Sequence, residues 1–284
     1  MERRYALIGL GEAGSAFAGA RDPAVVAAAY DLKPGMQPAY DAARVIGCTS
    51  AEDALRDAGT VLSLVTADEA FAAARAYAGY LAPRALWLDM NSVAPGTKRA
   101  AAQAVEAAGG RYVDVAIMSP AHPALLDAPL LVSGPHAEAG ARALAGFGFT
   151  RVRVVGDTIG QASSIKMIRS VMIKGIEALT AECVLAAEAA GVRDEVLASL
   201  DATERPQSWA ARANYNLDRM MVHGLRRAAE MEEVLKTLEE LGTGGDMTCG
   251  TILRQRGIGA RALAVPKTLD AKLDLILDGK AQAA

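Results

Sequence analysis

Three glycines near the N-terminus have a spacing that suits the binding of a phosphate group. They are Gly9, Gly11 and Gly14, in the pattern G-x-G-x-x-G directly after the apolar run "YALI". This spacing allows a tight turn, close approach of a pyrophosphate and close packing of a helix on a strand, with the helix N-terminus facing the anion. Glu12 and Ala13 would contribute backbone N–H groups at that helix start. The stretch predicts a dinucleotide site, although tight packing alone can produce the same spacing.

A carboxylate follows the second predicted strand. Asp31 ends the run "AVVAAAYD", 17 residues after Gly14, where the dinucleotide-binding fold uses a carboxylate to bind the adenine ribose hydroxyls. A carboxylate repels a 2′-phosphate, which favours NAD over NADP. NADP is not excluded, because Lys33 could bind that phosphate. After the next strand, Val65 and Thr66 would face the cofactor at the carboxyl end of the parallel strands.

A lysine in the second half of the chain could exchange protons with a substrate. Lys166 lies six residues after Gly160 in "GQASSIKMIRS", at the start of a long predicted helix. Its neighbours on the helix are largely apolar, and partial burial would disfavour the charged form, which suits a proton donor and acceptor. Ser170 and Lys174 follow one and two turns later on the same face. The alternative is a lysine whose stem lies along apolar surface while its ammonium stays in water.

The elements that must position these residues form two groups. Short apolar runs alternate with alanine-rich helical segments in the first part of the chain, which is typical of a doubly wound, mostly parallel sheet. These runs are "YALIGLG", "AVVAAAYDL", "TVLSLV", "ALWLDM", "RYVDVAIM", "PLLVSG" and "RVRVVG". From Gln161 onward the pattern is helical, with one segment of about 30 residues and shorter stretches near Val196, Ser208, 224–241, Cys249 and 267–277. We therefore expect an α/β dinucleotide-binding Rossmann domain over 1–158 and an all-α domain over 159–284.

Composition narrows the class of partner. The 284 residues include 30 basic and 33 acidic side chains, for a net charge of −3; this balance favours a small-molecule partner over nucleic acid or an anionic membrane surface. The cysteines Cys48, Cys183 and Cys249 lack C-x-x-C spacing, which indicates a reducing compartment without disulfides or structural zinc. We expect no metal site, because the three histidines are scattered. No apolar stretch reaches ~18 residues and the N-terminal run lacks a secretory cleavage pattern, so we expect a cytoplasmic protein.

The two motifs together resemble the signatures of the β-hydroxyacid dehydrogenases, the family of 3-hydroxyisobutyrate, tartronate semialdehyde and 6-phosphogluconate dehydrogenases. The resemblance covers nearly the whole chain. The family's G-L-G-x-x-G appears as "GLGEAG", and its G-x-G-x-x-x-K-x-x-x-N appears as "GQASSIKMIRS". The resemblance implies that Lys166 is the general acid/base that exchanges a proton with the substrate while the nicotinamide exchanges a hydride. Ala162 replaces the second glycine, and Ser170 replaces the asparagine that would bind substrate.

Two further segments correspond to substrate-binding patterns of this family. D-x-S-T falls on "LDMNSV", where Asn91 and Ser92 could bind the substrate and Asn91 also the cofactor. D-A-P-V-S-G-G falls on "DVAIMSPAH", where Ser119 replaces the first glycine and His122 brings an imidazole nearby. His122 could bind substrate or transfer a proton, or it could simply be satisfied by local hydrogen bonds. These departures favour a substrate that is bulkier than hydroxyisobutyrate or differently charged.

The predicted second domain adds a possible anion site and an oligomer. His223, Arg226 and Arg227 can share one helix face, either to contact an anionic substrate or as a solvated face. The family resemblance implies a homodimer or a higher homo-oligomer.

The predicted function is NAD(P)-dependent hydride transfer to or from a small β-hydroxyacid or related carbonyl. One alternative is an imine reductase on the same fold, and retention of Lys166 favours alcohol chemistry over it. Another is a non-catalytic protein that senses a dinucleotide, which would need the glycines and Asp31 but not Lys166.

Overall fold

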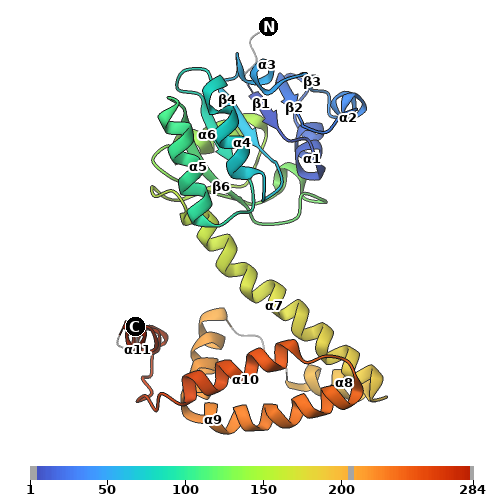
Figure 1. Ribbon diagram of the computed structural model, residues 1–284, viewed down its shortest axis with the longest axis vertical. Helices are drawn as coiled ribbons and strands as arrows, with labels where there is room; N and C mark the ends of the chain where they lie inside the picture. Colours follow the sequence, from blue (N-terminus) through green and yellow to red (C-terminus); the bar gives the residue numbers. More distant parts are fainter. Residues whose placement is uncertain (1–4, 204–207, 282–284) are drawn as a thin grey trace. The chain divides into compact units, whose positions relative to one another are not determined.

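The computed structural model describes residues 5–203 and 208–281 (Figure 1). The chain divides into two compact units, the first ending at Val171 and the second beginning at Met172. This division falls inside helix α7 (Gln161–Ala189), which begins in the first unit and ends in the second. The domain boundary at residue 158 stays a prediction, and it lies just before this helix.

The first unit is built on an eight-stranded sheet in the order β3-β2-β1-β4-β5-β6-β7-β8. All neighbouring strands are parallel except β6 and β7, which are antiparallel. The first six strands have the order of the dinucleotide-binding fold, so the predicted fold class is confirmed. The strands are β1 (Tyr5–Ile8), β2 (Ala27–Tyr30), β3 (Ile46–Gly47), β4 (Thr60–Ser63), β5 (Leu86–Asp89), β6 (Arg111–Ile117), β7 (Leu130–Ser133) and β8 (Val152–Gly156).

Helices cover both faces of this sheet. One face packs against α1 (Glu12–Ala20), α2 (Gln37–Ala42) and α6 (Ala137–Phe147), and the other against α3 (Ala51–Leu55), α4 (Ala70–Tyr77) and α5 (Pro95–Ala107). Strand residues alternate between the two cores: Leu88 belongs to the first and its neighbour Trp87 to the second. Figure 1 shows α4 and α5 side by side on their face.

Two elements differ from the sequence-based prediction. Strand β3 was not predicted, because two residues are too short to show a hydrophobic period. The stretches near Ser208 and 224–241 form a single helix, α9 (Trp209–Leu241). Gly224 does not end this helix; a Cβ there would lie 2.4 Å from the carbonyl oxygen of Gln255, so the glycine permits a close crossing with α10 (Asp246–Gly259).

Among the residues that the structure describes, the second unit consists of helices and their connections and has no strand, which confirms the predicted all-α region. It holds the rest of α7, then α8 (Arg193–Thr203), α9, α10 and α11 (Leu269–Ala281), and Figure 1 shows α9 and α10 packed side by side. Glu182 on α7 accepts hydrogen bonds from the backbone N–H groups of Met247 (2.9 Å) and Thr248 (3.0 Å) at the start of α10. No helix within the described ranges has the length and apolar character needed to cross a bilayer.

Candidate active site

The turn between β1 and α1 needs glycine at two of its three predicted positions. Gly9 has φ +90°, and a Cβ there would lie 2.5 Å from the carbonyl oxygen of Leu64. A Cβ on Gly14 would lie 2.5 Å from the carbonyl oxygen of Gly9, so this glycine lets α1 pack directly on the turn. At Gly11 a Cβ would meet nothing within 4 Å. Gly9 and Gly14 are therefore required by the backbone of the turn, whereas Gly11 borders open space.

The start of α1 is open toward that space. The helix begins after Gly11, which has no side chain to cap it. Its first N–H groups have no partners within the helix and carry a partial positive charge. Gly11, Glu12 and Ala13 line a cavity of about 450 Å³, a volume typical of small-molecule sites. The predicted Val65 and Thr66 line the same cavity. These residues fit a pyrophosphate.

Asp31 is fixed at the end of β2 beside this turn. Its Oδ2 accepts a hydrogen bond from the N–H of Leu10 (2.7 Å), and its Oδ1 accepts one from the N–H of Lys33 (2.9 Å). Tyr30 and Tyr77 line the cavity close by, with their rings edge to face. Burial raises the pKa of Tyr77, so its phenol stays neutral. The cavity thus offers an oriented carboxylate next to aromatic surface, which suits a ribose attached to a flat base.

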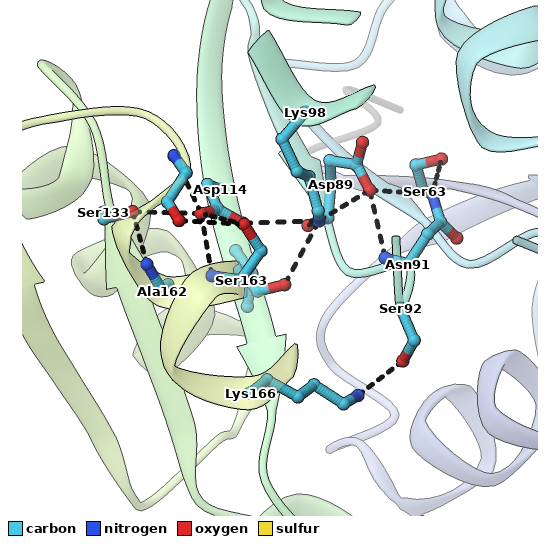
Figure 2. A network of polar contacts seen from close by, with 12 residues as sticks. Ser63, Asp89, Asn91, Ser92, Lys98, Asp114, Ser133, Ala162, Ser163 and Lys166 are labelled. Atoms are coloured by element: carbon cyan, nitrogen blue, oxygen red, sulfur yellow. Dashed lines mark hydrogen bonds and ion pairs between the residues drawn. The ribbon is translucent and has the colours of Figure 1, made fainter. Parts of the chain in front are cut away.

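A row of buried polar side chains crosses the middle of the sheet. Ser63, Asp89, Asp114 and Ser133 lie in register on β4, β5, β6 and β7, and all four are fully buried. Their side chains lie on the α5 face of the sheet, where Lys98 of α5 contacts both aspartates (Figure 2). None of these five residues is predicted from the sequence to be a site residue.

Asn91 and Ser92 lie at one end of this row. Asn91 donates two hydrogen bonds to Asp89 Oδ1, from its backbone N–H (3.0 Å) and its Nδ2 (2.8 Å), and Nδ2 also donates to Ser63 Oγ (3.1 Å). The Oδ1 of Asn91 is buried and accepts no hydrogen bond from the residues that the structure describes. Ser92 is exposed, and its Oγ accepts a hydrogen bond from Lys166 Nζ at 2.5 Å (Figure 2). Two of the predicted site residues, Ser92 after β5 and Lys166 on α7, are therefore in direct contact.

The start of α7, the helix that carries Lys166, is bound to the polar row. Asp114 Oδ2 accepts hydrogen bonds from the N–H groups of Gly160 (3.1 Å) and Ser163 (3.0 Å) and from Ser163 Oγ (3.1 Å). Ser133 Oγ accepts one from the N–H of Ala162 (3.0 Å). Ala162, which departs from the family signature, is fully buried against Ala116 and Leu131.

For the remaining predicted residues the structure gives no side-chain hydrogen bond, among the described residues, to Asn91, Ser92 or the Lys166 amine. Their roles stay predictions. Ser170 Oγ donates a hydrogen bond to the carbonyl oxygen of Lys166 (2.9 Å). Ser119 Oγ donates to the carbonyl oxygen of Pro120 (3.1 Å), and His122 is exposed. Lys174 is exposed and belongs to the second unit.

The proposed anion-contact residues also lie in the second unit. His223 and Arg227 are half-buried on α9, whereas Arg226 is exposed. Arg227 Nε is buried and has no hydrogen-bond partner within the described part of the chain. Within the ranges that the structure covers, no three His, Cys, Asp or Glu side chains are grouped as metal ligands would be.

Comparison with protein families assigns the first unit. Residues 4–145 match the NAD binding domain of 6-phosphogluconate dehydrogenase, and residues 187–258 match a domain of unknown function (DUF1932). The glycine turn, the cavity and the first match define an oxidoreductase that uses NAD(P). The chain belongs to the family of the 6-phosphogluconate dehydrogenase NAD-binding domain, as a divergent relative of the β-hydroxyacid dehydrogenases.

Solved structures agree with this assignment over almost the full length. A conserved hypothetical protein from Sinorhizobium meliloti 1021 is 35% identical, with a TM-score of 0.61 over 96% of this chain and 95% of that one. A conserved protein described as structurally similar to 3-hydroxyacid dehydrogenases is 30% identical, with a TM-score of 0.60 over 92% of this chain and 100% of that one. An imine reductase from Myxococcus stipitatus, solved with NADP+, is 17% identical, with a TM-score of 0.75 over 96% and 99%. This last likeness shows a shared fold.

Proposed function

We propose that this protein transfers a hydride between NAD and a small β-hydroxyacid or related carbonyl compound, with Lys166 as general acid/base. The observation that carries the proposal is the contact of Lys166 Nζ with Ser92 Oγ, directly after Asn91 and at the end of β5. It brings one amine and one hydroxyl together, next in sequence to the amide of Asn91. That set can orient a hydroxyl group and exchange its proton.

Lys166 acts on the substrate oxygen in both directions. During oxidation its neutral amine accepts the hydroxyl proton as the C–O bond becomes a carbonyl; during reduction its ammonium returns that proton. The nicotinamide, when bound, accepts or supplies the hydride on the same carbon. Ser92 Oγ accepts one N–H of Lys166, which holds Nζ in one place, and its own hydroxyl hydrogen is available to the substrate.

Asn91 offers a second fixed group to the ligands. Its amide nitrogen is committed to Asp89 and Ser63, so the amide cannot turn without losing both contacts. The free Oδ1 can accept a hydrogen bond from an N–H or O–H of the cofactor or substrate. Such a bond would satisfy a buried acceptor that is otherwise costly to leave unpaired.

NAD is the proposed dinucleotide because of the way Asp31 is held. Two backbone N–H groups fix its carboxylate at the cavity wall, where it can accept from ribose hydroxyls and would repel a 2′-phosphate. Lys33 also lines the cavity, so the preference is a matter of relative affinity.

Imine reduction is the second candidate, supported by the fold likeness to imine reductases. The same Lys166 ammonium could protonate the nitrogen of a C=N bond as the carbon receives a hydride. The two reactions differ in substrate and share the acid/base, so a panel that contains both classes separates them.

The test combines cofactor binding with turnover. NADH and NADPH binding to the purified protein would be followed by nucleotide fluorescence, and turnover by absorbance with hydroxyacids, their semialdehydes and cyclic imines. Lys166→Ala should lower kcat by about 10²- to 10⁴-fold while the NADH Kd changes little. Lys166→Arg is the matched control, because it keeps a charged donor but cannot act as a base. Equal kcat in the wild type and Lys166→Arg would remove Lys166 from proton transfer. If the wild type turns over only the imines of the panel, and Lys166→Ala loses that turnover, the second candidate is favoured.

We also propose a homo-oligomer assembled through the second unit. Its helices expose large apolar side chains, among them Ile176, Leu179, Leu200, Leu225 and Leu253, the last 71% exposed. Apolar surface of this extent commonly marks an interface. A molar mass of one chain, 29.5 kDa, by light scattering at micromolar concentration would contradict this proposal.

A further inference from the structure

Lys98 is a charged side chain buried in the core of the first unit. Its side chain is 0% exposed. Nζ donates to the carbonyl oxygen of Asp89 (2.5 Å), to Asp89 Oδ1 (3.0 Å) and to the carbonyl oxygen of Val115 (3.4 Å), and it lies 3.4 Å from Asp114 Oδ1. Burying an ammonium is costly even when it is paired, and well-packed apolar residues often serve stability better. The buried charge of Lys98 therefore indicates a role other than packing in the core.

The two carboxylates that Lys98 contacts each hold a different part of the site. Asp89 holds Asn91 through its backbone N–H and its side-chain amide. Asp114 holds the start of α7 through Gly160 and Ser163. Without a cation between them, two buried carboxylates in register on neighbouring strands would repel each other.

A neighbouring phenol completes the arrangement. Tyr112 donates its hydroxyl hydrogen to Asp89 Oδ2 at 2.6 Å. Burial raises the pKa of Tyr112 well above its usual range, and the adjacent Asp89 charge raises it further, so the group remains a neutral donor. Asp89 Oδ2 is thereby occupied, and Oδ1 is left to Lys98 and Asn91.

We propose that Lys98 is a positioning residue that sets Lys166 against Ser92 by clamping Asp89 and Asp114. The two halves of the Lys166–Ser92 contact come from different elements, and each is held by one of these carboxylates. Ser92 follows Asn91, which Asp89 binds, and Lys166 lies three residues after Ser163, which Asp114 binds (Figure 2). This proposal rests on the proposed function for its catalytic consequence, and its geometry can be tested independently of turnover.

The first test compares two variants that each remove one buried cation from the first unit. Lys98→Met removes the clamp. Arg21→Met is the matched control, because Arg21 is also buried and its side chain donates, among the described residues, only to backbone carbonyl oxygens, including those of Ala18 and Ala43. Both should lower the melting temperature. Only Lys98→Met should lower kcat, by about 10- to 100-fold, since small misplacements of reacting groups have effects of this size. Equal kcat in the two variants would overturn the proposal.

The second test reads the position of Lys166 without a substrate. Acetic anhydride acetylates lysines at rates that follow exposure and protonation, and mass spectrometry gives the rate at Lys166 relative to exposed Lys174 on the same helix. In Lys98→Met this ratio should rise by about twofold or more as the Lys166 contact loosens, and in Arg21→Met it should not change. An unchanged ratio in Lys98→Met would overturn the proposal. If the wild type turns over no panel compound, the proposed function fails while this ratio still decides the role of Lys98.

A milder variant guards against loss of folding in Lys98→Met. Ser163→Ala removes one hydroxyl contact to Asp114 and leaves every charge in place. Its kcat should fall by about 3- to 10-fold, as expected for one hydrogen bond, and the acetylation ratio should move in the same direction as in Lys98→Met. A wild-type kcat and ratio in Ser163→Ala would contradict the clamp.

Discussion

Two helix N-termini in the first unit differ in whether side chains accept hydrogen bonds from their backbone N–H groups. The start of α1 has no side-chain cap, and a Cβ on Gly11 would meet open space. The start of α7 is closed, because Asp114 accepts from the N–H groups of Gly160 and Ser163 and Ser133 accepts from that of Ala162. The open end keeps its partial positive charge for an anionic ligand. The closed end has used its donors to hold Lys166 in place. A third helix, α10 in the second unit, is closed in the same manner by Glu182.

Replacing Gly9 by alanine should have the largest effect on stability. The residue has φ +90°, and the new Cβ would lie 2.5 Å from the carbonyl oxygen of Leu64, the residue after β4. We expect a loss of about 2–5 kcal/mol in the free energy of unfolding, from the left-handed conformation and the clash together. Urea titration followed by circular dichroism measures it. Gly11→Ala is the control, and it should change stability by less than about 0.5 kcal/mol.

Closing the open helix should abolish tight cofactor binding without harming the fold. Gly11→Asp would place a capping carboxylate at the start of α1, where it would stabilise the helix and repel a pyrophosphate. We expect the NADH Kd to rise by about 100-fold, with the melting temperature unchanged or higher. Fluorescence titration gives the Kd. Tight NADH binding by this variant would show that the anion lies elsewhere.

Opening the closed helix should have a smaller, local effect. In Asp114→Asn, an amide would replace the carboxylate that accepts three hydrogen bonds from Gly160 and Ser163. We expect a loss of about 1–3 kcal/mol, from weakened hydrogen bonds to the start of α7 and from the loss of one of the two carboxylates that face Lys98. Amide hydrogen exchange at Gly160 and Ser163 should accelerate, while the Gly9–Gly14 turn keeps its protection. Uniform acceleration across the unit would point to a general loss of stability instead.

The cap on α10 should show the smallest effect and a defined pH dependence. Burial raises the pKa of Glu182, but hydrogen bonds from Thr248 and Met247 lower it by more, so the net pKa is below its usual range. The stabilising contribution is therefore present above the usual glutamate pKa and is lost as pH falls through the lowered value. Glu182→Gln should destabilise α10 by about 0.5–2 kcal/mol near pH 7, and the difference from the wild type should shrink in acid. Hydrogen exchange at Met247 and Thr248 measures it; a difference that grows in acid would contradict the assignment.

The residues of the glycine turn could be predicted from the sequence more readily than those of the buried polar row. Backbone rules govern the glycine turn, so Gly9, Gly14 and Asp31 are readable from spacing alone. The polar row depends on register between strands that are far apart in sequence, and no local pattern encodes that Asp89 lies beside Asp114. One signal was present: Lys98 begins the buried stripe of α5 that continues through Ala101, Ala102 and Val105. A lysine that shares the apolar face of a helix is expected to be buried, and a buried ammonium needs carboxylate or carbonyl oxygens as partners.

From the closed start of α7 we expect the first unit to need residues beyond 145 in order to fold. The match to the NAD-binding domain stops at residue 145, yet Asp114 and Ser133 find their helix donors only at 160–163. A chain truncated at 145 would keep every residue of the cofactor cavity, lose β8 and leave buried acceptors unpaired on β6 and β7. Expressed alone, that fragment should aggregate or remain partly unfolded, whereas a chain extending through Val171 should fold and bind NADH. The start of α7 is therefore part of the core of the cofactor-binding unit, although it follows the matched NAD-binding segment in sequence.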